Sequence, residues 1–132
     1  MKAYFADTAY FVGLYNRHDA LHSPALVYDP LAEAFVTTEF ILVEVATFFV
    51  RPGDRVVFAN LDATLRANPR VVILPATADL YARGLALFAA RSDKEWSLTD
   101  CISFEVMGEL ELTDALTGDQ HFGQAGFRAL LS

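Results

Sequence analysis

The stretch that decides the fold is Trp-Ser-Leu-Thr-Asp-Cys-Ile-Ser-Phe-Glu-Val-Met, residues 96–107. It is typical of a helix start, because Ser97 or Thr99 can accept hydrogen bonds from the first amides of the helix. Asp100 falls in the first turn, where the helix dipole favours a negative charge. The apolar residues that follow predict a helix from Thr99 to about Glu111. Since a capping role alone would explain Asp100, the positions of the other carboxylates decide whether it does more.

The composition is that of one folded domain, residues 1–132. The chain has 132 residues, 54% of them hydrophobic and 13% aromatic, which excludes a disordered protein. No apolar run reaches the roughly 18 residues that cross a bilayer, and the N-terminus lacks the apolar segment of a signal peptide. The single cysteine, Cys101, excludes an internal disulfide and a cysteine-based zinc cage. We therefore expect a cytoplasmic protein.

The charge argues against a simple nucleic-acid binder. Seventeen acidic and ten basic residues give a formal net charge of −7, whereas nucleic-acid binders normally carry a basic face. Two bound divalent cations would bring this charge to −3 and would sit where a phosphate could bridge them. Bound divalent cations could therefore reconcile a nucleic-acid function with the negative charge of this chain.

Short apolar segments alternate with helical patterns along the chain. We expect strands at 2–6, 34–37, 71–74, 115–117 and 127–131. We expect helices at 9–16, 24–29, 39–50, 54–67, 78–91 and 99–111, with a short turn or helix at 120–124. Thr8, Thr38 and Thr77 are the expected helix caps, and Pro30 predicts a kink or an end at Asp29. This alternation predicts an α/β fold, a parallel sheet with helices on both faces, whose ligands bind beyond the carboxyl ends of the strands.

Three aspartates fall at that edge of the predicted sheet. Asp7 follows the first strand, Asp119 follows the fourth, and Asp100 opens a helix that can face the same edge. Asp114 begins the fourth strand, so it belongs to the opposite edge and is excluded.

Glu44 is the most informative carboxylate, because no other charge lies between Glu39 and Arg51. A helix that is apolar all round is a buried helix. A lone ionised carboxylate in such a helix costs several kcal/mol unless it is paired. Its structural explanation would be an arginine partner or a gap to solvent.

Four such carboxylates in one place would repel one another and raise one another's pKa. Hard divalent cations remove this conflict, and Mg²⁺ needs only a few carboxylates because it keeps several waters. Two ions about 3.5–4 Å apart suit in-line attack on a phosphodiester.

The motifs around these residues resemble the PIN-domain ribonucleases, and in particular the bacterial VapC-like toxins of type II toxin–antitoxin pairs. The resemblance rests on Asp-Thr at 7–8, Thr-Thr-Glu-Phe-Ile-Leu-Val-Glu at 37–44 and Ser-Leu-Thr-Asp-Cys-Ile-Ser-Phe at 97–104. Ala-Leu-Thr-Gly-Asp-Gln-His-Phe at 115–122, with Ala-Gly-Phe at 125–127, completes it, so that it covers nearly the whole chain.

The resemblance implies a PIN-like three-layer sandwich with a central parallel sheet of about five short strands. It also implies a metal-dependent endoribonuclease that holds Mg²⁺ or Mn²⁺, cuts RNA, forms a homodimer and is blocked by a cognate antitoxin. The residues that match the family's acidic positions are Asp7, Glu44, Asp100 and Asp119, of which the last varies among members. Thr8 matches a supporting hydroxyl, and Thr99 is a second candidate for that role.

Other features are more often structural than functional. His121 is expected to be a loop residue, and Trp96 to pack under the loop that leads into the Asp100 helix. Cys101 is expected to be a small buried residue next to the site. The basic candidates for phosphate contact do not form a run; they are Arg51, Arg55, Arg66, Arg91 and Lys94. An exposed apolar patch on the early helices would indicate a partner surface; the candidates are Phe11, Tyr15, Phe48, Phe49 and Phe58.

Three alternatives to a toxin stay open at this point. They are a PIN nuclease that is not a toxin, a PIN fold that only binds RNA, and a phospho-acceptor signalling domain. The last would need an aspartate after the third strand, where this chain has Leu74 and Pro75.

Overall fold

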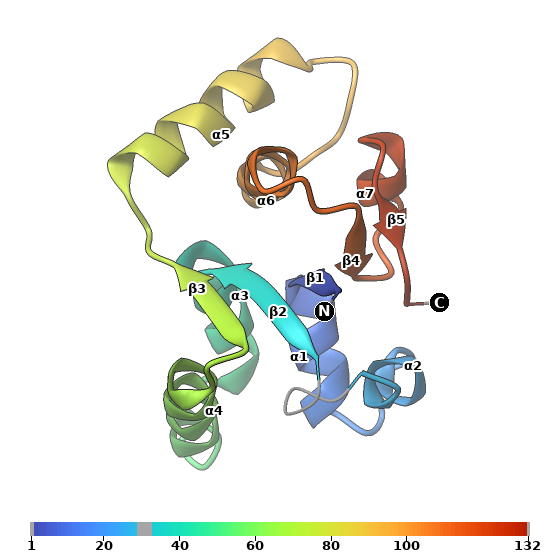
Figure 1. Cartoon of the computed structure of the whole chain (residues 1–132). Helices are drawn as coiled ribbons and strands as arrows, with labels where there is room; N and C mark the ends of the chain where they lie inside the picture. The colour runs from blue at the N-terminus through green and yellow to red at the C-terminus, as the bar shows by residue number, and fades with distance from the viewer. Residues whose placement is uncertain (1, 29–32, 132) are drawn as a thin grey trace.

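A single sheet of five parallel strands runs through the molecule in the order β3-β2-β1-β4-β5 (Figure 1). The computed structural model describes residues 2–28 and 33–131, so the predicted break at Asp29 and Pro30 lies outside the described residues. The strands are β1 (Ala3–Ala6), β2 (Ala34–Thr38), β3 (Val71–Leu74), β4 (Asp114–Leu116) and β5 (Arg128–Ala129). β5 is shorter than predicted, because only two of its residues pair with β4.

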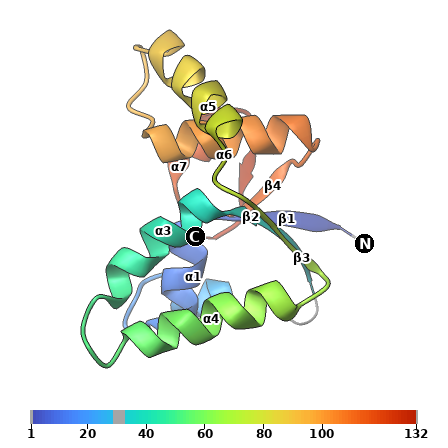
Figure 2. The same cartoon turned by 90° about the vertical axis from the view of Figure 1, so that its left-hand side faces the viewer.

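Helices cover both faces of this sheet, which confirms the predicted three-layer α/β fold. They are α1 (Thr8–Tyr15), α2 (His22–Leu26), α3 (Glu39–Ala46), α4 (Arg55–Ala67), α5 (Ala78–Ala90), α6 (Leu98–Glu109) and α7 (Gln120–Gln124). A 3₁₀ turn, η1 (Thr47–Phe49), continues α3. Helices α5 and α6 lie on one face, and α1, α3 and α4 lie on the other (Figures 1 and 2). Within the described ranges, every helix is too short or too polar to cross a membrane.

The local signals for helix starts are mostly as predicted. The Thr38 and Thr77 hydroxyls cap α3 and α5, each accepting a hydrogen bond of 3.1 Å from an amide of the first turn. Thr8 as the cap of α1 is wrong, because Asp7 occupies the cap position and Thr8 is already helical. Ser97 rather than Thr99 caps α6, whose first residue is Leu98.

The core lies on both sides of the sheet and is built from aromatic and aliphatic side chains. Phe5, Tyr10, Phe35, Phe122 and Met107 are among the largest fully buried side chains. Burying each such side chain contributes about 1.5–3 kcal/mol relative to leaving it in water. This packing holds the strand ends in place, and the candidate site is built on those ends.

Helices α5 and α6 are in close contact at Gly84. A Cβ atom at this position would lie 2.2 Å from Ile102 Cγ1 and 3.1 Å from the Ile102 backbone. Glycine is therefore required here for the two helices to pack.

The order of the strands creates a switch point at the carboxyl end of β1. The chain passes from β1 to β2 and β3 on one side and places β4 and β5 on the other. In open α/β sheets this is where ligands bind. Asp114 lies at the opposite edge, as predicted, and is buried in salt bridges with Lys2 and Arg128.

The prediction that the helix carrying Glu44 is buried all round is wrong. Helix α3 has one buried face and one outer face, on which the Val43 side chain is 67% exposed. Phe48, in the η1 turn, is 62% exposed. The sequence does not distinguish the exposed face from the buried one, because the residues on both faces of α3 are hydrophobic.

Candidate active site

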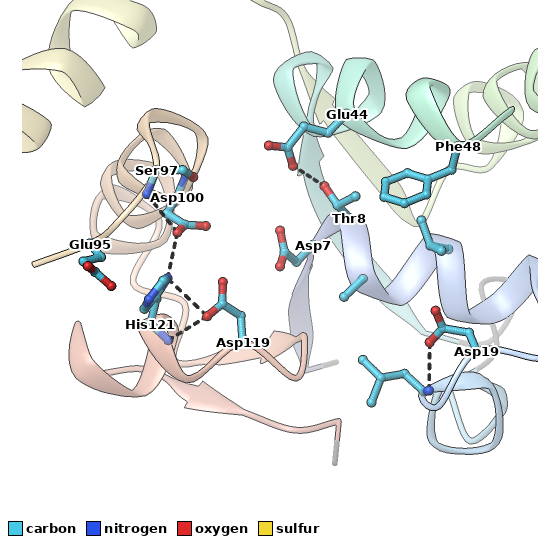
Figure 3. Close-up of a pocket in the computed structure, with 13 residues that line it drawn as sticks. Asp7, Thr8, Asp19, Glu44, Phe48, Glu95, Ser97, Asp100, Asp119 and His121 are labelled. Atoms are coloured by element: carbon cyan, nitrogen blue, oxygen red, sulfur yellow. Dashed lines mark hydrogen bonds and ion pairs between the residues drawn. The ribbon is translucent and has the colours of Figure 1, made fainter. Parts of the chain in front are cut away.

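A pocket of about 500 Å³ lies beyond the carboxyl ends of β1 and β4 (Figure 3). Its walls contain all four predicted carboxylates together with two further ones: Asp7, Asp19, Glu44, Glu95, Asp100 and Asp119. The described residues that line it include no lysine or arginine. The pocket is therefore a region of concentrated negative charge built from segments that are far apart in the sequence.

Asp7 lies at the centre of the pocket, directly after β1, and is 7% exposed. The Thr117 hydroxyl donates a 2.8 Å hydrogen bond to Asp7 Oδ2. Burial, opposed by the hydrogen bond from Thr117 and reinforced by the charges of Asp100 and Glu44, raises the pKa of Asp7 to about 7. Asp7 is therefore a carboxylate whose charge the protein alone does not compensate.

Thr117 also connects Asp7 to the last acidic residue. The hydroxyl oxygen of Thr117 accepts a 3.0 Å hydrogen bond from the Asp119 amide, while its proton goes to Asp7. The segment that follows β4 is thus held against the end of β1.

Glu44 reaches the pocket from α3 and meets the start of α1. The Thr8 hydroxyl donates a 2.5 Å hydrogen bond to Glu44 Oε1 (Figure 3). The side chain is partly buried and faces the acidic pocket, so it is neither paired with an arginine nor sealed in the core. Glu44 lies in the same pocket as the other three predicted carboxylates, at an opening between α3 and α1.

Asp100 stands at the third position of α6 and closes a capping box with Ser97. The Ser97 hydroxyl accepts a 3.0 Å hydrogen bond from the Asp100 amide, and Asp100 Oδ2 accepts one of 3.1 Å from the Ser97 amide. The expectation that Ser97 and Thr99 would leave the Asp100 side chain free is therefore wrong. The cap holds Oδ2, while another oxygen of the carboxylate faces Asp7 across the pocket (Figure 3).

Burial raises the pKa of Asp100, and the charge of Asp119 raises it further, whereas the hydrogen bond from the Ser97 amide lowers it. The Asp100 side chain is 12% exposed, so solvent screens this charge poorly.

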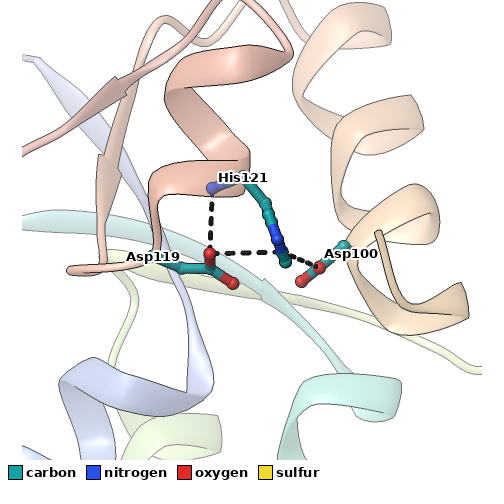
Figure 4. A group of neighbouring side chains, drawn as sticks. All are labelled: Asp100, Asp119 and His121. Atoms are coloured by element: carbon teal, nitrogen blue, oxygen red, sulfur yellow. Dashed lines mark hydrogen bonds and ion pairs between the residues drawn. The ribbon is translucent and has the colours of Figure 1, made fainter. Parts of the chain in front are cut away.

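His121 lies between Asp100 and Asp119 (Figure 4). Its Nδ1 is 3.2 Å from Asp100 Oδ2 and 3.3 Å from Asp119 Oδ1. The His121 amide also donates a 2.9 Å hydrogen bond to Asp119 Oδ1, which caps α7. One ligand atom from each of these three residues lies within 4.8 Å of the others, so they could share a metal ion.

Several pocket residues were not predicted from the sequence to belong to the site. His121 was expected to be a loop residue, and Thr117 was assigned only to a strand, although both flank Asp119 in the sequence. Asp19 and Glu95 were not predicted as site residues, and Asp19 Oδ1 accepts a local hydrogen bond of 2.9 Å from the Leu21 amide. Thr99 is not among the lining residues, so its supporting role stays a prediction without structural evidence.

Two of the basic candidates, Arg66 and Arg91, form ion pairs away from the pocket. Arg66 forms salt bridges with Glu39 and Asp62. Arg91 forms a salt bridge with Asp93, and its Cζ atom lies 4.8 Å from the centroid of the Trp96 ring. Trp96 is buried, as expected for a packing residue, and its ring lies edge-on to Phe104 of α6.

The family model of the PIN domain matches residues 4–128. The chain belongs to the PIN-domain family. This confirms the resemblance read from the sequence motifs, and it removes the phospho-acceptor domain from consideration.

Comparison with individual proteins agrees with this membership. The chain is 30% identical over 125 residues to the 23S rRNA-specific endonuclease VapC20 of two Mycobacterium tuberculosis strains, CDC 1551 and H37Rv, covering 93% of this chain and 94% of the relative. The crystal structure of M. tuberculosis VapC20, described as a sarcin–ricin loop cleaving toxin, matches with a TM-score of 0.80 at 26% identity. That match covers 97% of this PIN domain and 98% of VapC20.

Proposed function

We propose that this PIN domain is a divalent-metal-dependent endoribonuclease and the toxin of a toxin–antitoxin pair. The observation that carries the proposal is the convergence of Asp7, Glu44, Asp100 and Asp119 on one pocket, with no lysine or arginine among its described lining residues. Family membership and the likeness to VapC20, an RNA endonuclease by name, support the reaction type. The raised pKa of Asp7, caused first by burial, supports a site that is completed by cations.

The donor set suits divalent metal ions. Asp7, Glu44, Asp100 and Asp119 offer the hard oxygen ligands that Mg²⁺ and Mn²⁺ prefer, and His121 adds a nitrogen. An imidazole suits transition metals better than Mg²⁺, so we expect Mn²⁺ to bind more tightly. Such ions, when bound, supply an activated water and positive charge at the scissile phosphate.

The chain's own residues hold the carboxylates ready for this role. Thr117 holds Asp7, the Ser97 amide holds Asp100, and Thr8 holds Glu44, each through a hydrogen bond. Because these supports lie on rigid element ends, the carboxylates need little rearrangement when metal and substrate arrive. The expected products carry a 5′-phosphate and a 3′-hydroxyl.

Ribosomal RNA is the first substrate to test. VapC20 is named for 23S rRNA and for the sarcin–ricin loop, and this chain matches nearly its whole length. We propose the same class of substrate here, cut in the cytoplasm. A net charge of −7 predicts that RNA binding depends on the metal ions.

An antitoxin would have an apolar groove to occupy between α3 and α4. A cavity of about 370 Å³ there is lined by Val43, Ala46, Val50 and Phe58, and a neighbouring one of about 260 Å³ shares Val43, Ala46 and Phe58. This shape suits the apolar face of an amphipathic helix. The homodimer stays a proposal that light scattering of the purified protein would test.

The decisive experiment compares the wild type with Asp100→Asn on purified ribosomes and on free 23S rRNA. We expect cleavage with Mn²⁺ or Mg²⁺, none with EDTA, and a loss of about 100-fold or more in the variant. Asp79→Asn is the matched control, because the Asp79 side chain is 81% exposed and lies outside the pocket lining. Full activity of Asp100→Asn would refute the assignment.

Expression in a bacterial host distinguishes a toxin from the alternative functions. If the protein is a toxin, expression of the wild type arrests growth and expression of Asp100→Asn does not. A PIN nuclease without a toxin role cleaves RNA but leaves growth unchanged, and a binding module retains RNA without cutting it.

A further inference from the structure

A second pocket, of about 450 Å³, continues from the acidic pocket along α1. The two pockets share Val12 and Phe48, so a ligand that leaves the carboxylates in this direction passes over the Phe48 ring. Figure 3 shows this ring beside α1, on the side of the pocket away from Asp100 and Asp119. The second pocket differs in character, since its lining includes Asn16, Arg51 and one carboxylate, Asp54.

The exposure of Phe48 has no explanation in the packing of the domain. Its neighbour Phe49 turns inward and contacts Tyr15 and Phe58, with ring centroids 6.2 Å and 6.1 Å away. Phe48 is instead 62% exposed at the junction of the two pockets. An exposed aromatic ring beside a catalytic pocket offers a stacking platform for a flat ligand.

The polar lining residues have hydrogen-bonding capacity to spare. Arg51 forms no salt bridge with any residue in the described part of the chain, unlike Arg66, Arg83, Arg91 and Arg128. Asn16 accepts a 3.0 Å bond from the His18 amide through Oδ1, which leaves its NH₂ group to donate. The groove therefore combines the guanidinium of Arg51, the amide donor of Asn16 and the exposed aromatic ring of Phe48.

We propose that this groove is a subsite for one unpaired nucleotide of the RNA, next to the phosphate that is cut. The base stacks on Phe48, the amide of Asn16 contacts its edge, and Arg51 binds the neighbouring phosphate. Stacking requires a base that has left its helix, so the subsite selects single-stranded or looped RNA. This inference rests on the proposed ribonuclease function.

The mixed lining of this groove, with Arg51 to meet a phosphate and Phe48 to meet a base, favours RNA over the apolar face of a partner helix as the occupant. The acidic pocket repels phosphate unless cations are present, whereas Arg51 attracts it directly. The apolar α3–α4 groove, which suits a partner helix, has a different lining apart from Phe49.

The test uses two substitutions of the same ring in the full-length protein. Phe48→Leu keeps an apolar side chain but removes the stacking face, and we expect kcat/KM for RNA cleavage to fall about 10-fold. Phe48→Trp keeps the face and should cleave at a rate within about twofold of the wild type. Val56→Ala, at another exposed apolar side chain (60% exposed), is the control for surface hydrophobicity. Thermal melting verifies that all variants are folded.

The Phe48→Trp variant also reports binding without activity. The wild type has a single tryptophan, the buried Trp96, so fluorescence from residue 48 is specific to the variant. A short single-stranded RNA should quench the fluorescence of Phe48→Trp more than that of the wild type. The same strand in a duplex should cause no such additional quenching. Arg51→Gln should weaken this binding and lower its salt dependence by about one ion.

The outcomes of these experiments distinguish a failure of the proposed nucleotide subsite from a failure of the proposed ribonuclease function. If the wild type cleaves RNA and Phe48→Leu cleaves equally well, the subsite is wrong and the nuclease assignment stands. If Phe48→Leu impairs only antitoxin binding, the groove belongs to a protein partner. If the wild type neither cuts RNA nor binds the single strand, both proposals fall.

Discussion

Replacing Asp7 with asparagine should make the metal-free protein more stable while it abolishes cleavage. The carboxylate is 7% exposed and has its pKa raised from 3.8 to about 7, mainly by burial. A rise of about three units corresponds to roughly 4 kcal/mol of differential free energy between the two protonation states. Asparagine keeps an oxygen that can accept the hydrogen bond from Thr117, and it introduces no charge.

The sign of the pH dependence follows from the direction of this shift. A folded state with a raised pKa binds the proton more tightly than the unfolded chain between about pH 4 and pH 7. The stability that Asp7 contributes is therefore fully present below pH 4 and is lost as the pH rises through 7. We expect Asp7→Asn to exceed the wild type by up to about 4 kcal/mol at pH 8, and to match it near pH 4.

Urea unfolding followed by the fluorescence of the buried Trp96, with EDTA present, measures this difference. Asp79→Asn is the control, because its exposed side chain should change the free energy of unfolding by no more than about 0.5 kcal/mol at either pH. Added Mn²⁺ should stabilise the wild type and not Asp7→Asn. An advantage of Asp7→Asn that is equal at pH 4 and pH 8, or a loss of stability at pH 8, would refute the reasoning.

Three further predictions concern the pocket and the packing beneath it. Glu44→Gln keeps an oxygen for the bond from Thr8 but loses the charge, so cleavage should fall about 10- to 100-fold while the melting temperature stays unchanged. His121→Gln should weaken Mn²⁺ binding about 10-fold, measured by calorimetry, and Mg²⁺ binding less; equal losses would argue against a nitrogen ligand. Gly84→Ala should cost about 1–3 kcal/mol of unfolding free energy, because its Cβ would collide with α6. Gly108→Ala, in open space within α6, should instead gain about 0.5–1 kcal/mol, and similar effects at both glycines would contradict the packing argument.

Many of the predicted elements that rest on a local signal agree with the structure. The apolar runs at 71–74 and 115–117 became β3 and β4 to within a residue. Thr38 and Thr77 cap α3 and α5, because a hydroxyl at the cap position satisfies a free amide of the first turn. The apolar run of α3 misled the prediction, since its hydrophobic outer face in the structure borders a groove.

Sequence alone determined the fold class and the edge of the sheet at which the carboxylates gather. These follow from the alternation of strands and helices and from where each strand ends, both of which are local properties of the chain. Asp100, in the stretch 96–107, was correctly placed in the first turn of a capped helix. The structure adds that its carboxylate is itself part of the capping box with Ser97.

Only the tertiary structure decided how the pocket residues are held. Thr117 meets Asp7 across 110 residues, and Thr8 meets Glu44 across 36. The ring of His121 lies between two aspartates that are brought together by the packing of α6 beside α7. Such contacts depend on which strands pair and how the helices pack on them, and no local pattern of residues records that arrangement.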